Sequence, residues 1–255
     1  YAAASMGLRA AVLDLDLMFG NMYDMLGVDE PRDMAQLIDG EACGLSAAER
    51  VEATAMQLAP GVTLWGPCFQ PECAEVLSHP VEELISLLRI EADVLFVDTS
   101  THWGDAVAMA VAQCDRCLVV GQAGSAPSCV RAIDLAARVG VAKTKMTAVF
   151  NRFGAAGNQE EQALRFEMAV ALSSRVRVPD GASELHQMAA FGRLGEYMAS
   201  SSHYASEVSR CAAHLLKELG CDISAWERAQ QVDKGDRVTR RKMAPPWRLR
   251  RGEER

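Results

Sequence analysis

The sequence lacks long apolar runs and several motifs that mark common functional sites. No hydrophobic stretch approaches the roughly 20 residues that a membrane-spanning helix needs. Neither G-x-S-x-G nor a G-x-G-x-x-G after a strand occurs, which argues against a serine hydrolase and a dinucleotide-binding Rossmann domain. Cys114 and Cys117 have the spacing of zinc ligands, but no second pair or histidine cluster accompanies them. The sequence therefore favours none of these classes.

Basic residues are scarce in most of the chain. The net charge is −8, although Lys234–Arg255 hold nine basic and three acidic residues, about +6, so that the remainder carries about −14. Such an acidic body argues against sequence-specific nucleic-acid binding. We expect the basic tail to be solvated, or to contact anionic membrane or an acidic partner weakly. The eight cysteines are scattered, which is typical of free thiols in a reducing cytoplasm.

Short apolar runs predict six strands. Most of these runs are continuous instead of alternating, as in parallel strands that are covered on both faces. They are Ala11–Leu15, Val62–Trp65, Val94–Asp98, Cys117–Gly121, Met146–Asn151 and Arg175–Val178.

Stretches with helical spacing of apolar residues lie between or after these runs. They are Pro80–Ile90, Ser128–Val139, Glu160–Ala171 and Ala205–Leu219, the last followed by Gly220 as a C-cap. This order predicts an α/β fold, a doubly wound and mostly parallel sheet with helices on both faces. We expect one domain at residues 1–222 and a basic, disordered tail at residues 223–255.

Polar residues follow several of the predicted strands. In open parallel sheets, ligands bind beyond the carboxyl ends of the strands, so these residues are candidates for a site. They are Asp14, Asp16, Asp98, Asn151, Pro179 and Asp180. A lone aspartate after an apolar run can hold Mg²⁺ through water, because this ion needs few carboxylates. The structural alternatives are a helix cap at Asp98 and a turn residue at Asn151.

The ordered set of these stretches resembles the MinD/ParA family of deviant P-loop ATPases. The stretches are DLDLMFGN, VLFVD, VFNRFG and VPD, in that order along the chain. DLDLMFGNMYDMLG and DRCLVVGQAGSAPSCVRAIDLAARVG resemble the CpaE/TadZ branch, whose members act at the cell pole in the assembly of Flp (tight adherence) pili. The likeness runs from about Tyr1 to Leu219.

The resemblance implies roles for three carboxylates. Asp16 would orient or deprotonate the water that attacks the γ-phosphate of ATP, and Asp14 would support this loop. Asp98 would bind Mg²⁺ through water. Full-length members of the family are ATPases, so ATP hydrolysis is what the resemblance implies for the complete protein.

The resemblance also implies a base-binding region. Asn151 would hydrogen-bond the adenine edge, and Pro179 and Asp180 would border the base and ribose. An ATP-dependent homodimer is implied as well, together with pilus secretion or assembly components as partners. The implied location is the cytoplasm, peripheral to the inner face of the membrane or to the cell pole.

Two features depart from the family pattern. Thr99–Trp103 stands where the family often has prolines in a phosphate-sensing loop. The lysine-containing phosphate loop is absent, since no G-x-x-x-x-G-K-S/T occurs. We therefore expect the chain to be truncated before its first helix, without the first strand and phosphate loop, and to leave a gap between the strands that end at Asp98 and Gly121. Besides an ATP-dependent positioning or assembly factor for a pilus, two alternatives stay open: a non-catalytic docking hub, and a relative that positions chromosomes or flagella.

Overall fold

The computed structural model describes residues 1–73, 76–99, 102–155 and 159–232. Within these residues the strands are β1 (Ala10–Asp14), β2 (Met56–Ala59), β3 (Val62–Trp65), β4 (Val94–Asp98), β5 (Cys117–Gly121), β6 (Met146–Phe153) and β7 (Ser174–Pro179). All six predicted strands are confirmed within two residues at each boundary. β2 was not predicted.

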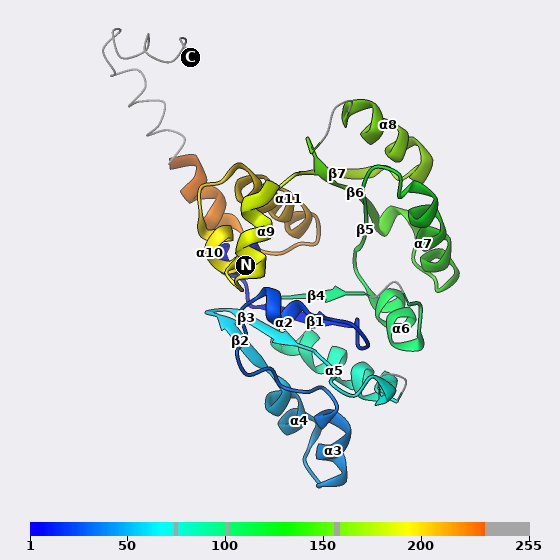
Figure 1. Ribbon diagram of the computed structural model, residues 1–255, viewed down its shortest axis with the longest axis vertical. Helices are drawn as coiled ribbons and strands as arrows, with labels where there is room; N and C mark the ends of the chain where they lie inside the picture. The colour runs from blue at the N-terminus through cyan, green and yellow to red at the C-terminus, as the bar shows by residue number, and fades with distance from the viewer. Residues whose placement is uncertain (74–75, 100–101, 156–158, 233–255) are drawn as a thin grey trace.

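Helices cover both faces of these strands (Figure 1). They are α1 (Ala2–Ser5), α2 (Met22–Met25), α3 (Gln36–Ala42), α4 (Ala47–Thr54), α5 (Ser78–Glu91), α6 (Asp105–Gln113), α7 (Ala126–Arg138), α8 (Gln159–Val170), α9 (Ala182–Ala190), α10 (Leu194–Ala199) and α11 (His203–Glu218), with 3-10 turns η1 (Pro71–Cys73) and η2 (Lys143–Lys145). The predicted helices correspond to α5, α7, α8 and α11. Among the helices of the described residues, none has the length and apolar character needed to cross a membrane.

The first sheet contains four strands in the order β2-β3-β1-β4. β3, β1 and β4 are parallel, and β2 is antiparallel to β3. Ala10 on the central strand β1 lies opposite Val62 on β3 and Val94 on β4. This register brings Asp14 and Asp98, the last residues of β1 and β4, next to each other.

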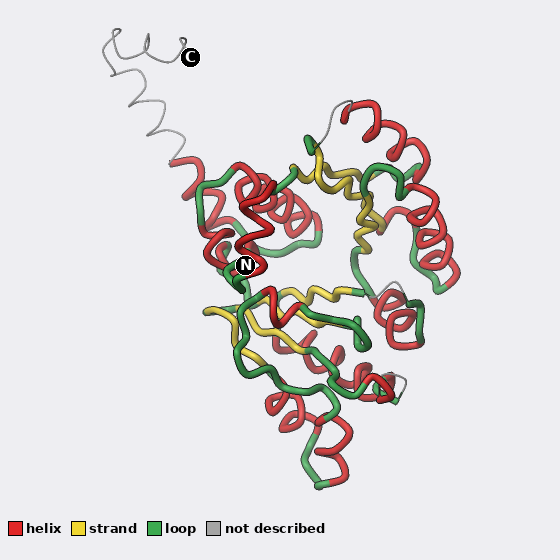
Figure 2. The backbone as a smooth tube through the Cα atoms, viewed as in Figure 1, coloured by secondary structure: helices red, strands yellow, loops and turns green. Residues whose placement is uncertain are grey.

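The second sheet contains three parallel strands in the order β5-β6-β7. The predicted α/β class with mostly parallel strands is confirmed, but the strands form two sheets and not one (Figure 2). Within the described residues β4 is hydrogen-bonded to β1 alone and β5 to β6 alone. No described strand lies between β4 and β5, so the strands form two separate sheets.

One layer of helices, α5 to α8, runs along both sheets. Each of these helices contacts the next, and α5, α7 and α8 contact β4, β5 and β6 respectively. The apolar spacing on α5 has the expected result, because Val81, Leu84 and Leu88 are all buried. On the other side, α11 contacts β7 and α1. The two layers cover much of both faces of the strands, in line with the continuously apolar strand sequences, although Phe96 on β4 and Leu118 and Val120 on β5 are exposed.

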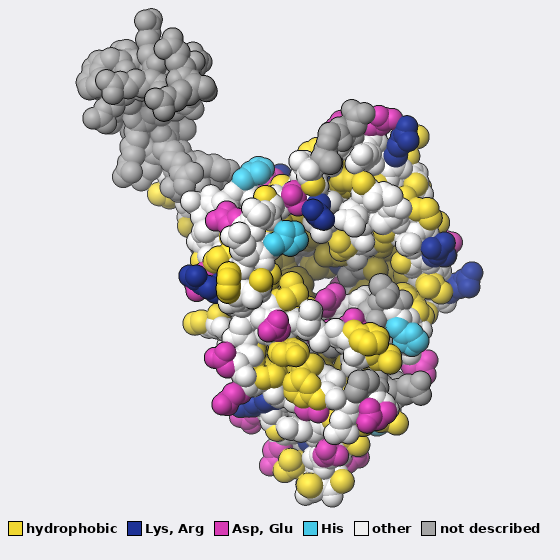
Figure 3. Space-filling model, viewed as in Figure 1, with side chains coloured by type: hydrophobic (Ala, Val, Ile, Leu, Met, Phe, Trp, Pro, Cys, Tyr) yellow, Lys and Arg dark blue, Asp and Glu magenta, His cyan; other side chains and the backbone are white. Residues whose placement is uncertain are grey.

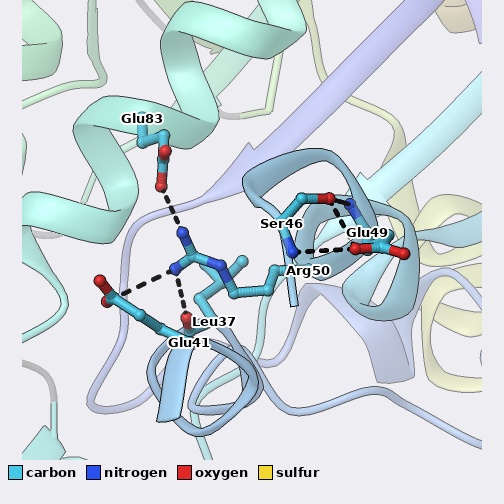
Figure 4. A network of polar contacts seen from close by, with 6 residues as sticks. All are labelled: Leu37, Glu41, Ser46, Glu49, Arg50 and Glu83. Carbon is cyan, nitrogen blue, oxygen red and sulfur yellow. Dashed lines mark hydrogen bonds and ion pairs between the residues drawn. The ribbon is translucent and has the colours of Figure 1, made fainter. Parts of the chain in front are cut away.

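The hairpin of α3 and α4 is tied to the rest of the domain by a buried arginine (Figure 4). Arg50 is only 7% exposed. Its Nη1 donates to the Leu37 carbonyl at 2.7 Å, and its Nη2 donates to Glu83 Oε2 at 2.9 Å. Glu41 lies 3.7 Å from Nη1. One guanidinium therefore connects α3, α4 and α5.

A capping box fixes the first turn of α4, on which Arg50 lies. The Ser46 hydroxyl accepts from the Glu49 amide at 3.3 Å, and Glu49 Oε2 accepts from the Ser46 amide at 2.9 Å. The Ser46 hydroxyl also donates to Glu49 Oε2 at 2.7 Å. This hydrogen bond and the one from the Ser46 amide stabilise the ionised form of Glu49 and lower the pKa of its carboxyl. Figure 4 shows the box beside the arginine.

The described fold continues beyond α11, into the stretch that the sequence analysis assigned to a tail. α11 is followed by Gly220 at φ +84°, in the predicted C-cap position. Residues 224–232, which belong to the predicted tail, are helical. They order because Ile223 is 3% exposed and Trp226 packs against the cluster formed by α1 and α11. The basic residues from Lys234 to Arg255 lie outside the described residues.

Candidate functional site

The carboxyl ends of β1 and β4 bring two aspartates together. Asp14 and Asp98 are partners in the parallel ladder, and the Leu15 amide donates to the Asp98 carbonyl at 2.8 Å. Neighbouring strands are about 4.8 Å apart, so the two carboxylates leave the sheet side by side. Asp14 and Asp98 therefore lie together at one edge of the first sheet.

The loop after β1 folds back over Asp14. The Asp16 amide donates to Asp14 Oδ1 at 2.9 Å, and the Gly20 amide donates to the Asp16 carbonyl at 2.6 Å. The Phe19 amide donates to Asp16 Oδ1 at 3.3 Å. A Cβ on Gly20 would lie 2.5 Å from the Asp16 carbonyl oxygen and 2.6 Å from Asp14 Oδ2. Only glycine can pass so close to the buried carboxylate, which explains the Phe19-Gly20-Asn21 sequence behind the two aspartates.

A cavity of about 350 Å³ lies over these carboxylates. It is lined by Tyr1, Val12, Asp14, Asp16, Phe19, Gly20, Asn21, Met22, Met25, Leu26, Leu58, Val62, Asp98 and Leu194. The lining contains three aspartates and no lysine or arginine among the described residues. A ligand that is attracted to this cavity should therefore carry positive charge.

Burial and mutual repulsion act on the same carboxylates. Asp14 is only 5% exposed, and burial raises the pKa of its carboxyl; the hydrogen bond from the Asp16 amide lowers the pKa, and the charge of Asp98 raises it. Asp98 is exposed as a residue, but its carboxyl is partly desolvated. This desolvation raises the pKa of the Asp98 carboxyl, and the negative charge of Asp16 raises it further. The pKa of both carboxyls is raised, and no positively charged side chain among the described residues acts on either carboxylate to offset this effect.

The donor set is compatible with a magnesium ion held through water. Mg²⁺ is usually bound by one or two carboxylates and several waters. The described residues contain no group of three His, Cys, Asp or Glu side chains close enough for direct chelation. The exposed Asp98 can hold a hydrated cation, whose charge would offset the repulsion between the aspartates. The same lining does not fit a triphosphate by itself, because it would oppose anions with anions.

The other predicted site residues lie in the second sheet. Asn151 belongs to β6, and its Oδ1 accepts from the Arg152 amide at 2.9 Å. Pro179 ends β7 and lies opposite Phe153. Asp180 follows, and its Oδ1 accepts from Arg152 Nε at 3.1 Å. None of Asn151, Pro179 and Asp180 lines the carboxylate cavity. The structure thus places the predicted residues in two groups, one at the end of each sheet.

The two groups are connected where α2 and α9 meet. A Cβ on Gly27, after α2, would lie 2.4 Å from the carbonyl oxygen of Gly192, after α9. Both glycines have positive φ, +74° and +65°. Two residues further along, Leu194 lines the carboxylate cavity. The segment after β7 therefore covers part of the site at the end of β1.

The sequence did not indicate the residues that form the cover over this cavity. Gly27, Gly192 and Leu194 have no motif around them, and only the common loop signal of glycine was available. Asp14, Asp16 and Asp98 could be selected because each follows a strand. In the predicted phosphate-sensing stretch Thr99–Trp103, residues 100 and 101 lie outside the described residues.

Comparisons with known proteins give the fold a family context. No protein-family model and no curated protein matches the sequence. Solved structures do match. A ParA family ATPase from Chlorobium tepidum has 15% identity and a TM-score of 0.69, over 84% of this chain and 90% of that chain. The cell division ATPase MinD from Pyrococcus furiosus has 17% identity and a TM-score of 0.68, over 85% and 89%. MinD from Pyrococcus horikoshii, in complex with Mg-ADP, has 16% identity and a TM-score of 0.65, over 86% and 88%. Because these identities are low, the likeness concerns the fold: the chain has the α/β fold of the ParA and MinD ATPases.

Proposed function

We propose that the protein is an ATP-dependent positioning or assembly factor for a surface machine, and specifically that it serves Flp-type pilus assembly as CpaE/TadZ proteins do. The observation that carries the proposal is the group of Asp14, Asp16 and Asp98 at the carboxyl ends of adjacent parallel strands. The fold of ParA and MinD ATPases supports an ATP-dependent role. The resemblance of the loop sequence DLDLMFGN supports the pilus branch.

Each carboxylate has a role in this proposal. Asp98 holds Mg²⁺ through water, since its exposed carboxylate lies beside Asp16 and lacks a basic neighbour. Asp16 orients a water molecule, because its Oδ1 is anchored by the Phe19 amide at 3.3 Å. Asp14 is a positioning residue: its Oδ1 accepts from the Asp16 amide and so holds the loop. ATP, when bound with Mg²⁺, would supply the free energy of its hydrolysis.

Residues of the second sheet would contact the nucleoside. Asn151 Oδ1 already accepts from the Arg152 amide, so its side-chain NH₂ group is the part that would donate to a purine edge. Pro179 and Asp180 would border the base and ribose. Donors for the phosphates are the missing part, since the cavity lining has no basic residue. We propose that the phosphates are held by donors other than the side chains that line this cavity.

The same lack of phosphate donors favours a second candidate function. In a non-catalytic docking hub the fold would serve as a binding surface for other assembly proteins. A role in positioning chromosomes or flagella is a third candidate. No described residue favours it over a role in pilus assembly. For the first candidate, the protein would act as an ATP-dependent homodimer in the cytoplasm, peripheral to the membrane or cell pole.

Metal binding by the 255-residue chain tests the carboxylate group. We expect Mn²⁺, used as a paramagnetic substitute for Mg²⁺, to bind with an affinity that falls at least about tenfold in Asp98→Ala. The matched control is Asp180→Ala, which removes the carboxylate at the end of the other sheet and should leave Mn²⁺ binding unchanged. Equal Mn²⁺ affinity in Asp98→Ala and wild type would remove Asp98 from the proposal.

The pilus assignment needs a test in the cell. Deletion of the gene should abolish or mislocalise pili, and the wild-type gene should restore them while Asp16→Ala does not. Restoration by Asp16→Ala would favour the docking hub. Normal pili together with misplaced chromosomes or flagella would favour the third candidate.

A further inference from the structure

A pair of cysteines lies where α6 passes into β5. Cys114 is the C-cap of α6, and its backbone is extended, at φ −71° and ψ 143°. Cys117 is the first residue of β5 and lies opposite Met146 on β6. The two thiols form a hydrogen bond with each other. Since the sulfurs of a disulfide are only about 2.05 Å apart, thiols that already touch can join with little movement of the backbone.

The segment between the two cysteines is held in place by Arg116. Its side chain is 16% exposed. Nη1 donates to the Thr144 carbonyl at 3.3 Å, and Nη2 donates to Glu218 Oε2 at 3.1 Å. These partners belong to η2 and α11, so the segment is tied to two other parts of the domain. A pair of thiols on a fixed segment loses little conformational freedom when its sulfurs join.

The two thiols differ in acidity. The hydrogen bond from the Cys117 thiol stabilises the Cys114 thiolate and lowers the pKa of Cys114 to about 7. Burial and the charge of Asp115 oppose this effect, and the positive charge of Lys145 supports it. The same hydrogen bond and burial raise the pKa of Cys117. Because the thiolate is the reactive form of cysteine, Cys114 is the nucleophile of the pair.

Cys114 is also the more accessible of the two from a cleft of about 560 Å³ between the sheets. Figure 3 shows this cleft as a hollow in the middle of the molecule, with hydrophobic side chains inside. Cys114 belongs to its lining and Cys117 does not. A cleft of this size admits a small molecule. Such a molecule would meet the nucleophilic thiol first.

Metal binding does not account for the pair. A structural zinc site takes four ligands, and no group of even three His, Cys, Asp or Glu side chains that could hold an ion occurs in the described part of the chain. Cys68 and Cys73 are arranged differently, since both thiols donate to Gln70, at 3.1 Å to its carbonyl and at 3.5 Å to its Oε1. Burial raises the pKa of Cys68. The Cys-x-x-Cys spacing of the first pair is the one that redox-active dithiols use.

We propose that Cys114 and Cys117 form a reversible redox site that exchanges with small disulfides of the glutathione disulfide class. The Cys114 thiolate attacks one sulfur of the small disulfide, forms a mixed disulfide and releases one small thiol, which takes up a proton. Cys117 then attacks the Cys114 sulfur, its proton passes to the second leaving thiol, and the protein disulfide forms. Two protein thiols are oxidised, and one small disulfide is reduced to two thiols. Excess small thiol reverses both steps, so in a reducing compartment the protein disulfide is transient.

Mass spectrometry of the 255-residue chain tests the proposal. The protein is equilibrated with glutathione and glutathione disulfide at a series of ratios, its free thiols are blocked with N-ethylmaleimide, and it is digested with trypsin. Trypsin cuts after Arg116, so a disulfide between Cys114 and Cys117 joins two peptides that separate on reduction. We expect the linked fraction to follow the square of the glutathione concentration divided by the glutathione disulfide concentration, because each protein disulfide releases two glutathiones.

Two results on the unaltered protein would overturn the proposal. One is the absence of linked peptides at every ratio. The other is a single glutathione retained on Cys114, with a dependence on the first power of the glutathione concentration. The reaction needs neither nucleotide nor Mg²⁺, so its failure would leave the proposed function untouched, and the reverse also holds.

Two matched variants locate the disulfide. Cys117→Ser removes the second sulfur and keeps a hydrogen-bond donor, whereas Cys129→Ala removes another cysteine from the same tryptic peptide. We expect Cys117→Ser to abolish the linked peptides and to leave one glutathione on Cys114, and Cys129→Ala to form them as the wild type does. Linked peptides that persist in Cys117→Ser, or that are lost in a folded Cys129→Ala, would place the disulfide on Cys129 and contradict the proposal.

Discussion

The two sheets treat charge at their carboxyl ends in opposite ways. At the end of the first sheet Asp14 and Asp98 lie side by side, and the cavity above them has no basic residue. In the second sheet the charges are paired: Arg152 binds Asp180 at 3.1 Å, and Arg177 binds Glu167 at 2.7 Å. Removing one partner of a compensated buried pair destabilises the fold, because the other charge stays buried alone, whereas uncompensated charges gain most from an external ion. The comparison indicates which end of the molecule should respond to a cation.

The network around Arg177 illustrates the compensated case. Its Nε donates to Glu167 Oε1, and its Nη1 donates to Glu160 Oε1 at 2.8 Å. The guanidinium also lies over the Phe153 ring, 5.4 Å from its centre. The hydrogen bonds that Arg177 donates to Glu167 and Glu160 raise the pKa of Arg177, so it stays charged at all ordinary pH values. Glu167 is 8% exposed, which makes it dependent on this partner.

The largest effect on stability is expected where a compensated charge loses its partner. Arg177→Met should lower the free energy of unfolding by about 2–3 kcal/mol, because Glu167 would stay buried with only Arg175 at 3.5 Å. Urea unfolding measures this. The control is Arg165→Met, which removes an exposed ion pair with Glu161 and should cost no more than about 0.5 kcal/mol. If both variants cost the same, the compensated charges are not what stabilises the second sheet.

A smaller loss is expected from crowding the uncompensated carboxylate. Gly20→Ala should cost about 1–2 kcal/mol, because the new Cβ would lie 2.6 Å from Asp14 Oδ2 and the loop would have to shift. Gly104→Ala is the control, since its Cβ would meet only His102 at the ordinary distance of 3.5 Å. Thermal unfolding and Mn²⁺ binding should both change in the first variant alone. An unchanged Gly20→Ala protein would show that the loop is not held against Asp14.

The smallest effect on stability is expected from neutralising Asp14, and it is a gain. Burial raises the folded-state pKa of this carboxyl, so the folded protein binds more protons than the unfolded protein once the pH exceeds the ordinary value of 3.8. Wild-type stability therefore falls as the pH rises through the window between 3.8 and the raised folded pKa, and it stays lower above that window. Asp14→Asn keeps an acceptor for the Asp16 amide and has no such dependence. Its advantage should be present at neutral pH and should vanish below the window; an advantage that grows towards acid would contradict this sign.

Much of the first sheet could be predicted from the sequence. Continuous apolar runs identified β1, β3 and β4, and the rule that parallel strands share one carboxyl edge brought Asp14 and Asp98 together. β2 was missed because Met56–Ala59 is short and pairs only through a turn with β3. The Pro60-Gly61 pair before β3 is a turn signal that could have indicated it.

Two aspects of the candidate site were not predictable from local pattern. The separation of Asn151 and Asp180 from the carboxylate cavity depends on the division of the sheet, which no single strand sequence records. The cover over the cavity depends on the backbone contact between Gly27 and Gly192, residues far apart in the sequence. Both features depend on contacts between segments that are far apart in the sequence. Helix and strand periodicity report only on residues that are close together in the sequence.

The hydrogen bonds of Arg50 bear on how the protein responds to oxidising and reducing conditions. All eight cysteines are unbridged thiols, so no covalent cross-link joins distant segments of this protein. Arg50 instead links a carbonyl 13 positions before it to a carboxylate 33 positions after it. Since an arginine side chain takes no part in thiol chemistry, this link does not respond to reductants that would open a disulfide. The Arg50 contacts that hold the hairpin of α3 and α4 are therefore the same in oxidising and in reducing solution.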